Sequence, residues 1–375
     1  MVRMSRTIKL AGLVALVLLL VSCGGSEVGS TSSSVGDQDV SSSVADQDDD
    51  VIKVTVAQAI PVFNFQGYFT AVEEGIFEAV GLEVETVEVP STSIQQALIS
   101  GSVDFANTTT VGVINGHSLG LDTIAVAKVC QGFIESVVFS ADAIERTGVK
   151  PTDPLQDRIE ALRGLTVGVT GLSSGTSVSL QVVLNAGGLT SSDLKEVIPV
   201  GSTDAEYAGL KAGDLDAIVV SSPVPEQIEA EGLGQTIINM AAGDLAEYAK
   251  VPALTLITSR EYADENPEAV TRMAQAYLLA GELARTDPDA VKAAVRNRIA
   301  PDLDEALFET AFENNYASIP LPDDQLFTQD DFDKMFIATN LIQEFNDSPT
   351  VSGVSMDDVM VNDFLEQAQE RLGDF

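Results

Sequence analysis

Ala97–Ala106, which reads ALISGSVDFA, and Gly209–Ile218, which reads GLKAGDLDAI, are two copies of one pattern. Aligned without gaps, they place Asp104 over Asp216 and a glycine over a glycine. Each copy begins as a helical pattern, stops at a glycine suited to the left-handed position after a helix, and continues as an apolar strand. The repeat predicts two similar α/β lobes, which would enclose a cleft for a ligand. Chance similarity between helix–glycine–strand units is the alternative explanation.

The N-terminal segment has the pattern of an export signal. Three basic residues within the first nine precede the apolar run Leu10–Val21, which is too short to span a membrane. The run ends in LVSC (20–23), which resembles the bacterial lipobox, where the chain is cut before the cysteine and that cysteine is acylated. We therefore expect residues 1–22 to be a lipoprotein signal peptide and Cys23 to carry lipid. A soluble secretory signal with an incidental cysteine is the alternative.

Residues 24–50 have the composition of a disordered tether. They are rich in Ser, Gly and Asp, contain no Lys, Arg or aromatic residue, and repeat SSSVGDQDV (32–40) as SSSVADQDD (41–49). The whole chain of 375 residues carries a net charge of −37. Such a charge repels phosphate backbones, so we expect no nucleic-acid partner.

The sequence offers little for metal or disulfide chemistry. If Cys23 is acylated, Cys130 has no partner within the chain, and its apolar surroundings predict a small buried residue. His117 is the single histidine, and its context is typical of a surface or capping residue. Because Cys and His do not cluster, we expect neither a metal nor a cofactor.

From about residue 51 to residue 260, strand-like segments alternate with helical ones, which predicts α/β lobes with mainly parallel sheets and helices on both faces. The expected strands are Lys53–Ala57, Glu83–Val89, Val103–Ala106, Thr123–Val129, Ser136–Ser140, Thr166–Thr170, Glu196–Val200, Ala217–Ser221, Thr236–Met240 and Ala253–Thr258. The expected helices between them include Phe69–Phe77, Ser174–Ala186, Ala205–Ala212 and Pro225–Gly232. Beyond residue 260 the pattern is helical, with helices expected at 267–285, 289–299, 304–316, 329–346 and 356–372.

Four polar junctions between strands and helices are candidate ligand-binding loops, because ligands of open α/β sheets bind beyond the carboxyl ends of strands. The candidate residues are Phe63, Asn64 and Phe65 after the first strand; Asn107, Thr108 and Thr109 after the third; Ser173, Ser174, Gly175 and Thr176 at the start of the second lobe; and Ser221 and Ser222 after the second copy of the repeat. Hydroxyls beside free N–H groups at helix starts favour an acidic or carbonyl-type acceptor. Ordinary capping is the alternative for each loop, with Ser222 as an N-cap and Pro223 at the first helical position.

We find no constellation of catalytic residues. GxSxG, HExxH and a cysteine with a histidine base are all missing, and Gly171–Thr176 matches neither GxGxxG nor GxxxxGK[ST]. Carboxylates are so abundant that a pair of them indicates nothing. The sequence therefore predicts a binding protein rather than an enzyme.

A resemblance to a known family covers roughly residues 52–285. Ala71–Glu85 reads AVEEGIFEAVGLEVE and is similar to the signature of ABC-transporter substrate-binding proteins of the nitrate/sulfonate/taurine and thiamine-pyrimidine-precursor group. Further similarities follow in order at Gln96–Asp104, Leu162–Val169, Leu210–Ala217 and Asn266–Val270.

The resemblance implies a two-lobed type II periplasmic-binding fold with a helical C-terminal region. One lobe would comprise 51–133 and 252–375, the other 134–251, with crossover strands near Gln131–Ser136 and Tyr248–Ala253. In this group the ligand commonly contacts the loops that correspond to Phe63–Phe65, Asn107–Thr109 and Ser173–Thr176. We expect an extracytoplasmic monomer, anchored to the cell membrane by lipid, that delivers a small organic nutrient to an ABC permease.

The nature of the solute is the most open question. The candidate loops contain no Arg or Lys, and Lys128 is the nearest cationic residue along the chain. Aromatic faces at Phe63 and Phe65 with the Asn64 amide favour a flat, neutral, pyrimidine-like heterocycle over sulfonate or nitrate, although these rings can equally fill the core. A pyrimidine-synthase-like enzyme and an extracellular sensor on the same scaffold are the alternatives to a transport protein.

Overall fold

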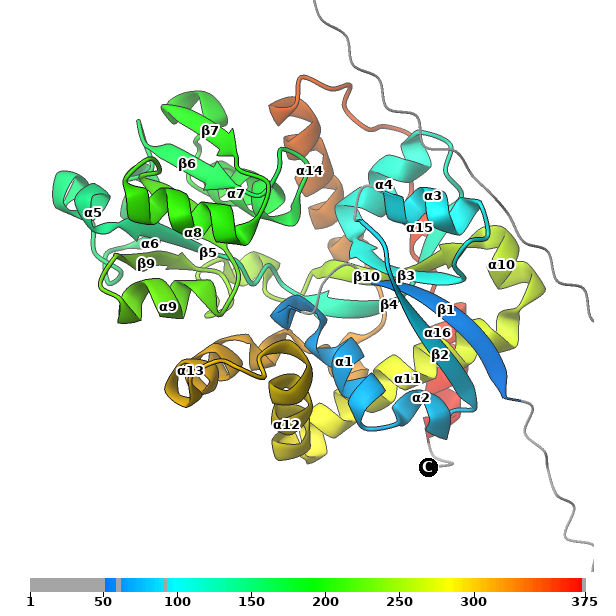
Figure 1. Ribbon diagram of the computed structural model, residues 1–375. Coiled ribbons are helices and arrows are strands. Elements are labelled where there is room, and N and C mark those ends of the chain that lie inside the picture. Colours follow the sequence, from blue (N-terminus) through cyan, green and yellow to red (C-terminus); the bar gives the residue numbers. More distant parts are fainter. Residues whose placement is uncertain (1–50, 59–61, 91–92, 373–375) are drawn as a thin grey trace, which may run out of the picture. The chain divides into compact units, whose positions relative to one another are not determined.

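Two five-stranded sheets organise the computed structural model, which describes residues 51–58, 62–90 and 93–372 (Figure 1). The signal peptide, Cys23 and the tether expected from the sequence lie outside the described residues. Both sheets belong to one compact unit that takes in every described residue. The lobe boundaries expected from the resemblance stay predictions.

The first sheet has the strand order β2-β1-β3-β10-β4. Its strands are β1 (Ile52–Gln58), β2 (Leu82–Glu88), β3 (Phe105–Thr109), β4 (Thr123–Gln131) and β10 (Pro252–Ser259). β1 is parallel to β2 and β3, whereas β10 is antiparallel to β3 and β4. Four strands therefore run in one direction, and β10 runs against them.

The second sheet repeats this arrangement in the order β7-β6-β8-β5-β9. Its strands are β5 (Ser136–Ser140), β6 (Thr166–Val169), β7 (Glu196–Pro199), β8 (Ala217–Val220) and β9 (Gly234–Asn239). β6 is parallel to β7 and β8, and β5 is antiparallel to β8 and β9. The ten strands expected from the sequence, and the mainly parallel character of the sheets, are confirmed.

The repeated sequence forms the same structure in each sheet. Helix α3 (Ile94–Ile99) leads into β3, and α8 (Thr203–Ala212) leads into β8. Between them, Gly101 and Gly213 adopt φ of 67° and 81°, a conformation that disfavours other residues. The carboxylate of Asp104 accepts from the N–H of Thr55 in β1 at 2.7 Å, and that of Asp216 accepts from the N–H of Thr166 in β6 at 2.8 Å. Each aspartate thus ties its strand to the neighbouring parallel strand of its own sheet.

Two segments cross between the sheets, one from β4 to β5 and one from β9 to β10, at the places that the resemblance implies. They are hydrogen-bonded to each other, because the N–H of Gly132 donates to the carbonyl of Val251 at 2.8 Å. Gly132 has φ 73°, and a Cβ placed there would lie 2.7 Å from the carbonyl oxygen of Ala249. Only glycine meets both demands, so close packing of the two crossings depends on this residue.

Helices cover the faces of both sheets (Figure 1). Besides α3 and α8, those between the strands are α1 (Gln66–Glu73), α2 (Ile76–Ala79), α4 (Thr110–Ser118), α5 (Ala141–Thr147), α6 (Leu155–Glu160), α7 (Gly175–Ala186) and α9 (Val224–Ala230). The expected helix at 69–77 is instead two helices, because Gly75 adopts φ 66° between α1 and α2. Buried β-branched and aromatic side chains from the strands and helices fill the core.

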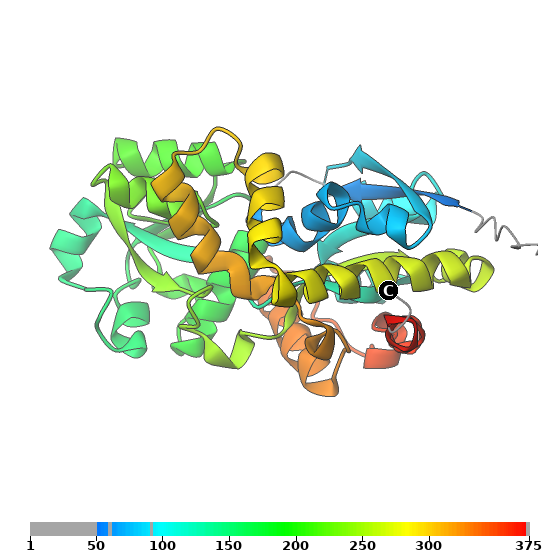
Figure 2. The ribbon, with the colours of Figure 1, turned by 90° about the horizontal axis from the view of Figure 1, so that it is seen from below.

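The C-terminal region is helical, as expected. It contains α10 (Arg260–Glu265), α11 (Pro267–Thr286), α12 (Pro288–Ile299), α13 (Glu305–Asn315), α14 (Gln329–Phe345), α15 (Met356–Val359) and α16 (Asp363–Glu370). The long helix α11, yellow in Figure 2, packs beside the red helix α16. The expected helix at 356–372 is interrupted, because Met360 forms a β-bridge with Ala125 and the N–H of Val361 donates to the Ala125 carbonyl.

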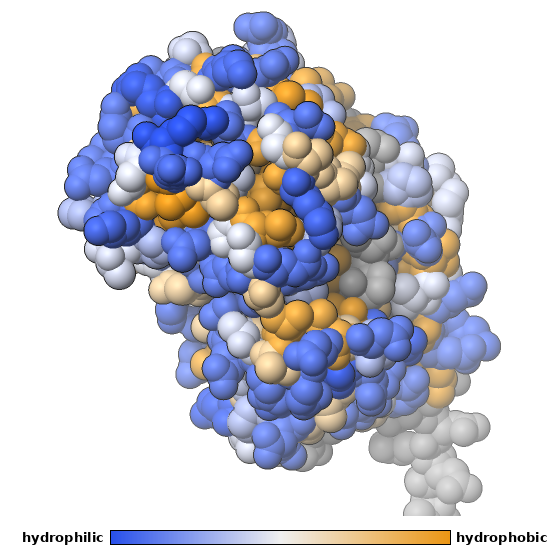
Figure 3. All heavy atoms as spheres, turned by 60° about the vertical axis from the view of Figure 1, so that its left-hand side comes forward, coloured by the Kyte–Doolittle hydropathy of each residue, from blue (hydrophilic) through white to orange (hydrophobic). Residues whose placement is uncertain are grey.

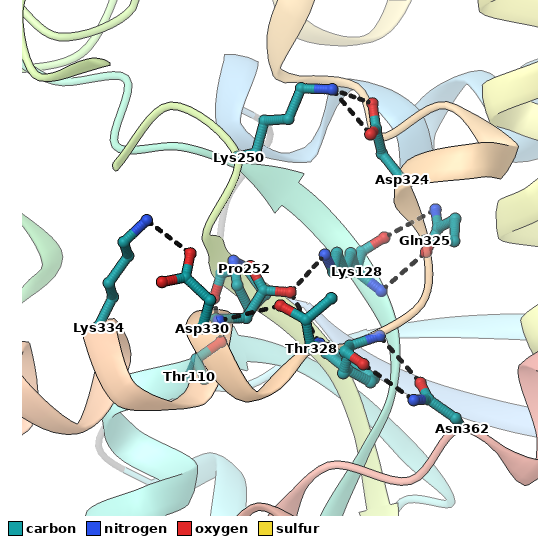
Figure 4. Close-up of polar contacts among 12 residues, drawn as sticks. Thr110, Lys128, Lys250, Pro252, Asp324, Gln325, Thr328, Asp330, Lys334 and Asn362 are labelled. Carbon is teal, nitrogen blue, oxygen red and sulfur yellow. Dashed lines mark hydrogen bonds and ion pairs between the residues drawn. The ribbon is translucent and has the colours of Figure 1, made fainter. Parts of the chain in front are cut away.

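Helix α14 packs against α4, which connects β3 to β4 of the first sheet, and against α7, which follows β6 of the second. A buried ion pair attaches α14 to β4: Lys128 Nζ lies 2.9 Å from Asp331 Oδ2, and these side chains are 4% and 9% exposed. The Gln325 side chain bonds both the N–H and the carbonyl of Lys128 (Figure 4). The Lys128 ammonium group is thus engaged by Asp331 inside the protein, which disfavours it as a partner for an anionic solute.

The surface presented in Figure 3 is mainly hydrophilic, with small hydrophobic patches, in keeping with a highly charged chain.

Cys130 is buried, as expected, and burial raises the pKa of its thiol to about 12. Within the part of the chain that the structure describes, every helix is too short or too polar to cross a bilayer.

Candidate functional site

A cavity lies where the two crossing segments run between the sheets. It holds about 20 Å³, roughly the room that one water molecule needs. The first crossing, the start of β10 and helices from both lobes contribute to its walls. The lining residues are Asn64, Thr109, Val111, Gly132, Phe133, Glu135, Gly175, Val178, Ala253, Leu254 and Met335. Because Thr109 precedes α4 and Gly175 begins α7, the amino ends of two helices meet at this cavity.

Glu135 is the one ionisable side chain among the described lining residues. It is 6% exposed, and its two carboxylate oxygens accept hydrogen bonds from Asn64 Nδ2 at 3.3 Å and from Ser179 Oγ at 2.7 Å. Burial raises the pKa of Glu135, and the bonds from Ser179 and Asn64 oppose that rise. Since Asn64 comes from the first sheet's side and Ser179 from α7, this carboxylate joins the two lobes.

The loop after β1 divides between the cavity and the core. Asn64, in the short helix Phe63–Phe65, reaches the cavity. Phe63 is fully buried with its ring 6.4 Å from that of Phe308, and Phe65 is 7% exposed. Neither phenylalanine is among the residues that line this cavity, so in this conformation both serve as core residues.

The polar turn after β3 likewise has two roles. Thr109 lines the cavity and caps α4, since its hydroxyl accepts from the N–H of Gly112 at 3.1 Å. Asn107 is buried away from the cavity, where it donates to Gln58 and accepts from the Tyr277 hydroxyl, each at 2.7 Å. Thr108 is partly exposed and is not a lining residue.

The second-lobe loop places only Gly175 in the cavity wall. Ser174 is the N-cap of α7, because its hydroxyl accepts from the N–H of Ser177 at 3.4 Å while it donates to the Gly171 carbonyl at 2.7 Å. Thr176 accepts from the N–H of Thr170 at 3.0 Å. The hydroxyl of Ser173 accepts from Asn346 at the end of α14. These hydroxyls surround the start of α7 and are already engaged within the protein.

Ser221 and Ser222 lie apart from the other candidates. Ser222 is buried, donates to Glu226 Oε1 at 2.8 Å and accepts from Asn315 at 2.7 Å. It lines a separate polar cavity of about 80 Å³ between α9 and α13. The expected capping there is wrong: Pro223, not Ser222, occupies the N-cap position of α9, because the helix begins one residue later, at Val224. Ser221 is partly exposed.

Eight of the eleven residues of the cavity wall were not anticipated from the sequence, and three of them have long or aromatic side chains. Glu135 and Phe133 belong to the first crossing, and Met335 belongs to α14. The expected position of the crossing was the available signal for Glu135 and Phe133, because a crossing between lobes borders the cleft. Met335 carried no such signal, since its helix lies far along the chain.

Larger hollows occur elsewhere on the described surface. One of about 690 Å³ lies on the second sheet, lined by Ala141, Ile144 and Thr236 among others. It receives no residue from the first sheet or from either crossing, so we place the site at the smaller cavity, where both lobes converge. In residues 51–58, 62–90 and 93–372, no group of three or more His, Cys, Asp or Glu is arranged to hold a metal.

Comparison with known proteins identifies the family to which the sequence is similar. The model of the NMT1-like family matches residues 51–300, two-thirds of the chain. A riboflavin-binding protein of Chloroflexus aurantiacus is 27% identical over 241 residues, which are 63% of this chain and 64% of that protein. The match thus spans less than two-thirds of that relative's length.

Solved structures share the fold at lower sequence identity. The alkanesulfonate-binding protein of Xanthomonas axonopodis pv. citri, solved with MOPS bound, superposes with a TM-score of 0.63 at 15% identity, over 83% of this chain and 99% of its own. The periplasmic nitrate-binding protein of Synechocystis PCC 6803 superposes with a TM-score of 0.58 at 15% identity, over 86% and 89%. These similarities confirm the expected periplasmic-binding fold.

Proposed function

Because this chain belongs to the NMT1-like family, we propose that it is an extracytoplasmic receptor that binds a small organic solute for an ABC importer. One observation carries the proposal: a cavity at the crossings takes its wall from both lobes and contains a buried carboxylate bonded from each side. A site assembled from two lobes has its full set of contacts only when they are closed, which gives selectivity.

Solute entry requires the lobes to separate. A cavity of about 20 Å³ is smaller than any organic nutrient, and pockets for such molecules usually measure hundreds of Å³. The two crossings are the only covalent links between the sheets within the described residues, so we assign the hinge to them. The solute would enter the opened cleft and be enclosed as Glu135 and Asn64 return toward each other.

We propose a flat, neutral, hydrogen-bonding heterocycle as the solute. No Arg or Lys is among the described lining residues, which disfavours sulfonate and nitrate. Phe133 offers an aromatic face in the wall, and Asn64 an amide. A riboflavin-binding relative supports the same class and makes flavins as well as pyrimidines worth testing.

The sequence-derived contacts belong to this proposal too. We expect Asn64, Thr109 and Gly175 to contact the solute in the closed form. The other candidate residues stay predicted contacts, which would require rearrangement on opening: Phe63, Phe65, Thr108, Ser173, Ser174, Thr176, Ser221 and the deeper Asn107 and Ser222.

Cys23 is proposed as the lipid attachment site that holds the receptor at the membrane beside its permease, with residues 24–50 as the tether. Incorporation of labelled palmitate into the wild type but not into Cys23→Ser tests the anchor.

We propose no catalytic role. Among the described lining residues one carboxylate stands without a nucleophile or a second acid or base beside it, which is too little for covalent or acid–base catalysis.

Thermal denaturation of the purified protein with pyrimidines, flavins, sulfonates and nitrate tests the proposal. A solute at 100 times its dissociation constant adds about 2.7 kcal/mol to the free energy of unfolding, so a true ligand should raise the melting temperature clearly. X-ray scattering should report compaction with the same compound. Unchanged melting temperature and scattering across a broad nutrient panel would contradict the receptor function.

A further inference from the structure

Glu135 is a buried carboxylate without a cation. No ion pair among the described residues includes it, and the groups bonded to its oxygens, Asn64 and Ser179, are neutral. Each carboxylate oxygen accepts one of these bonds, and backbone N–H groups of Ile134 and Glu135 also favour its charged form. A buried carboxylate gains most from additional hydrogen-bond donors, because burial otherwise penalises its charge.

The position of Glu135 also opposes anionic solutes. Its Oε1 atom would lie 3.8 Å from a Cβ on Gly175, the first residue of α7, and Oε2 accepts from Ser179 in the second turn of the same helix. An anionic ligand at this end of the 12-residue helix would therefore lie beside a resident carboxylate. Like charges in a site of low dielectric repel strongly.

A second buried carboxyl group, that of Glu206, responds to the charge of Glu135. Glu206, in the first turn of α8, is fully buried, and neither of its oxygens has a hydrogen-bond partner among the described residues. Burial raises the pKa of Glu206 to about 9, and the charge of Glu135 adds to that rise. No described ion pair involves Glu206 either. With a pKa of about 9, Glu206 is protonated and uncharged at neutral pH, so the repulsion of an anionic solute at the cavity rests on Glu135.

We propose that Glu135 selects solutes that present an N–H donor to the cavity and rejects anions. This inference rests on the proposed receptor function and narrows it to one chemical class, nitrogen compounds with an N–H on the edge that meets Glu135. Asn64 and Ser179 orient the carboxylate from opposite lobes, so the donor completes its hydrogen bonds only in the closed form.

Matched ligands test the donor requirement. Riboflavin carries an N–H at N3, 3-methylriboflavin replaces that hydrogen by a methyl group, and flavin mononucleotide adds a phosphate. Uracil and 1,3-dimethyluracil form a smaller pair with and without N–H groups. Calorimetric titration should find the N–H member of a pair bound at least about tenfold more tightly, and methanesulfonate and nitrate unbound.

Variants identify the residue responsible. Glu135→Gln should weaken binding of the N–H ligand roughly 10- to 100-fold and narrow the difference between the members of each pair. Glu226→Gln is the matched control, because Glu226 is also a buried second-lobe carboxylate with two neutral donors but does not line this cavity. Urea denaturation of each variant verifies folding. If Glu135→Gln does not fold, Glu135→Asp replaces it in the binding measurements.

The outcomes separate the two proposals. Tight binding of methanesulfonate or nitrate, or equal binding of methylated and unmethylated partners, overturns donor selection and leaves the receptor function standing. A Glu135→Gln variant that binds the N–H ligands as tightly as the wild type also overturns donor selection and leaves the receptor function standing. Failure of every compound in the broad nutrient panel to bind overturns both.

Discussion

Gly132 tests whether the two crossings must pack as closely as the structure has them. Its φ of 73° costs an alanine about 1–2 kcal/mol. The added Cβ would also lie 2.7 Å from the carbonyl oxygen of Ala249, so backbone must move, and overpacking of this kind costs about 1–3 kcal/mol. Gly132→Ala should therefore lower the free energy of unfolding by about 2–5 kcal/mol. Gly148 is the matched control: it has φ 70°, and nothing lies within 4 Å of a Cβ placed there, so Gly148→Ala should lose only about 1–2 kcal/mol.

Urea denaturation of the wild type and both variants measures these losses, with the slope against urea indicating whether the unfolded ensemble is comparable. The reasoning requires Gly132→Ala to be the less stable variant by at least about 1 kcal/mol. Equal losses of stability in the two variants would refute this reasoning, because they would mean that the backbone of the second crossing moves away from the added Cβ at no cost in free energy.

Three further predictions concern the ion pair, the buried acid and the second-lobe loop. Lys128→Met leaves Asp331 buried without its cation and should lower the free energy of unfolding by about 3–5 kcal/mol in urea denaturation. Combining it with Asp331→Leu removes the buried charge and should restore most of that free energy. A double variant as unstable as the single one would argue against a stabilising ion pair between Lys128 and Asp331. Because the pKa of Glu206 is raised to about 9 from 4.5, the folded state binds more protons than the unfolded state between these pH values, and the free energy of unfolding should fall as pH rises by up to about 1.4 kcal/mol per unit. Glu206→Gln should flatten that dependence in melts at pH 5, 7 and 9, and parallel curves would contradict this. Ser174→Ala should cost about 1 kcal/mol of stability as a lost cap and, like Thr176→Val, weaken solute affinity by about 1–2 kcal/mol in calorimetric titration; unchanged affinity in both would remove the loop from the site.

The regular elements could be predicted from the sequence because their signals are local. Apolar alternation and glycine punctuation located every strand of the two sheets, and the repeat around Gly101 and Gly213 indicated that the lobes are alike. The errors arise where a distant partner decides the backbone. The helix expected at 356–372 is interrupted because Val361 pairs with Ala125, a contact that no local pattern reveals.

The candidate site was only partly predictable for a related reason. The loops at strand ends were located, but the role of each polar side chain depends on its neighbours in space. Asn107 has the same residue type as Asn64, yet it bonds Gln58 and Tyr277 inside the first lobe. Glu135 is one of 57 acidic residues, and its place in the cavity wall distinguishes it from Glu206 and Glu226, which are also buried without a cation.

Helix α14 has a consequence for how affinity can evolve. The Lys128–Asp331 pair attaches it to the first sheet, while Asn346 at its end donates to the Leu172 carbonyl and to Ser173 in the second lobe. In a receptor that closes on its solute, separating the lobes therefore has to break contacts at the α14–α7 interface. The apparent dissociation constant scales inversely with the fraction of molecules able to bind, so each substitution at that interface rescales affinity for all solutes by one common factor. Sensitivity to nutrient concentration can then be adjusted without altering which nutrient is chosen.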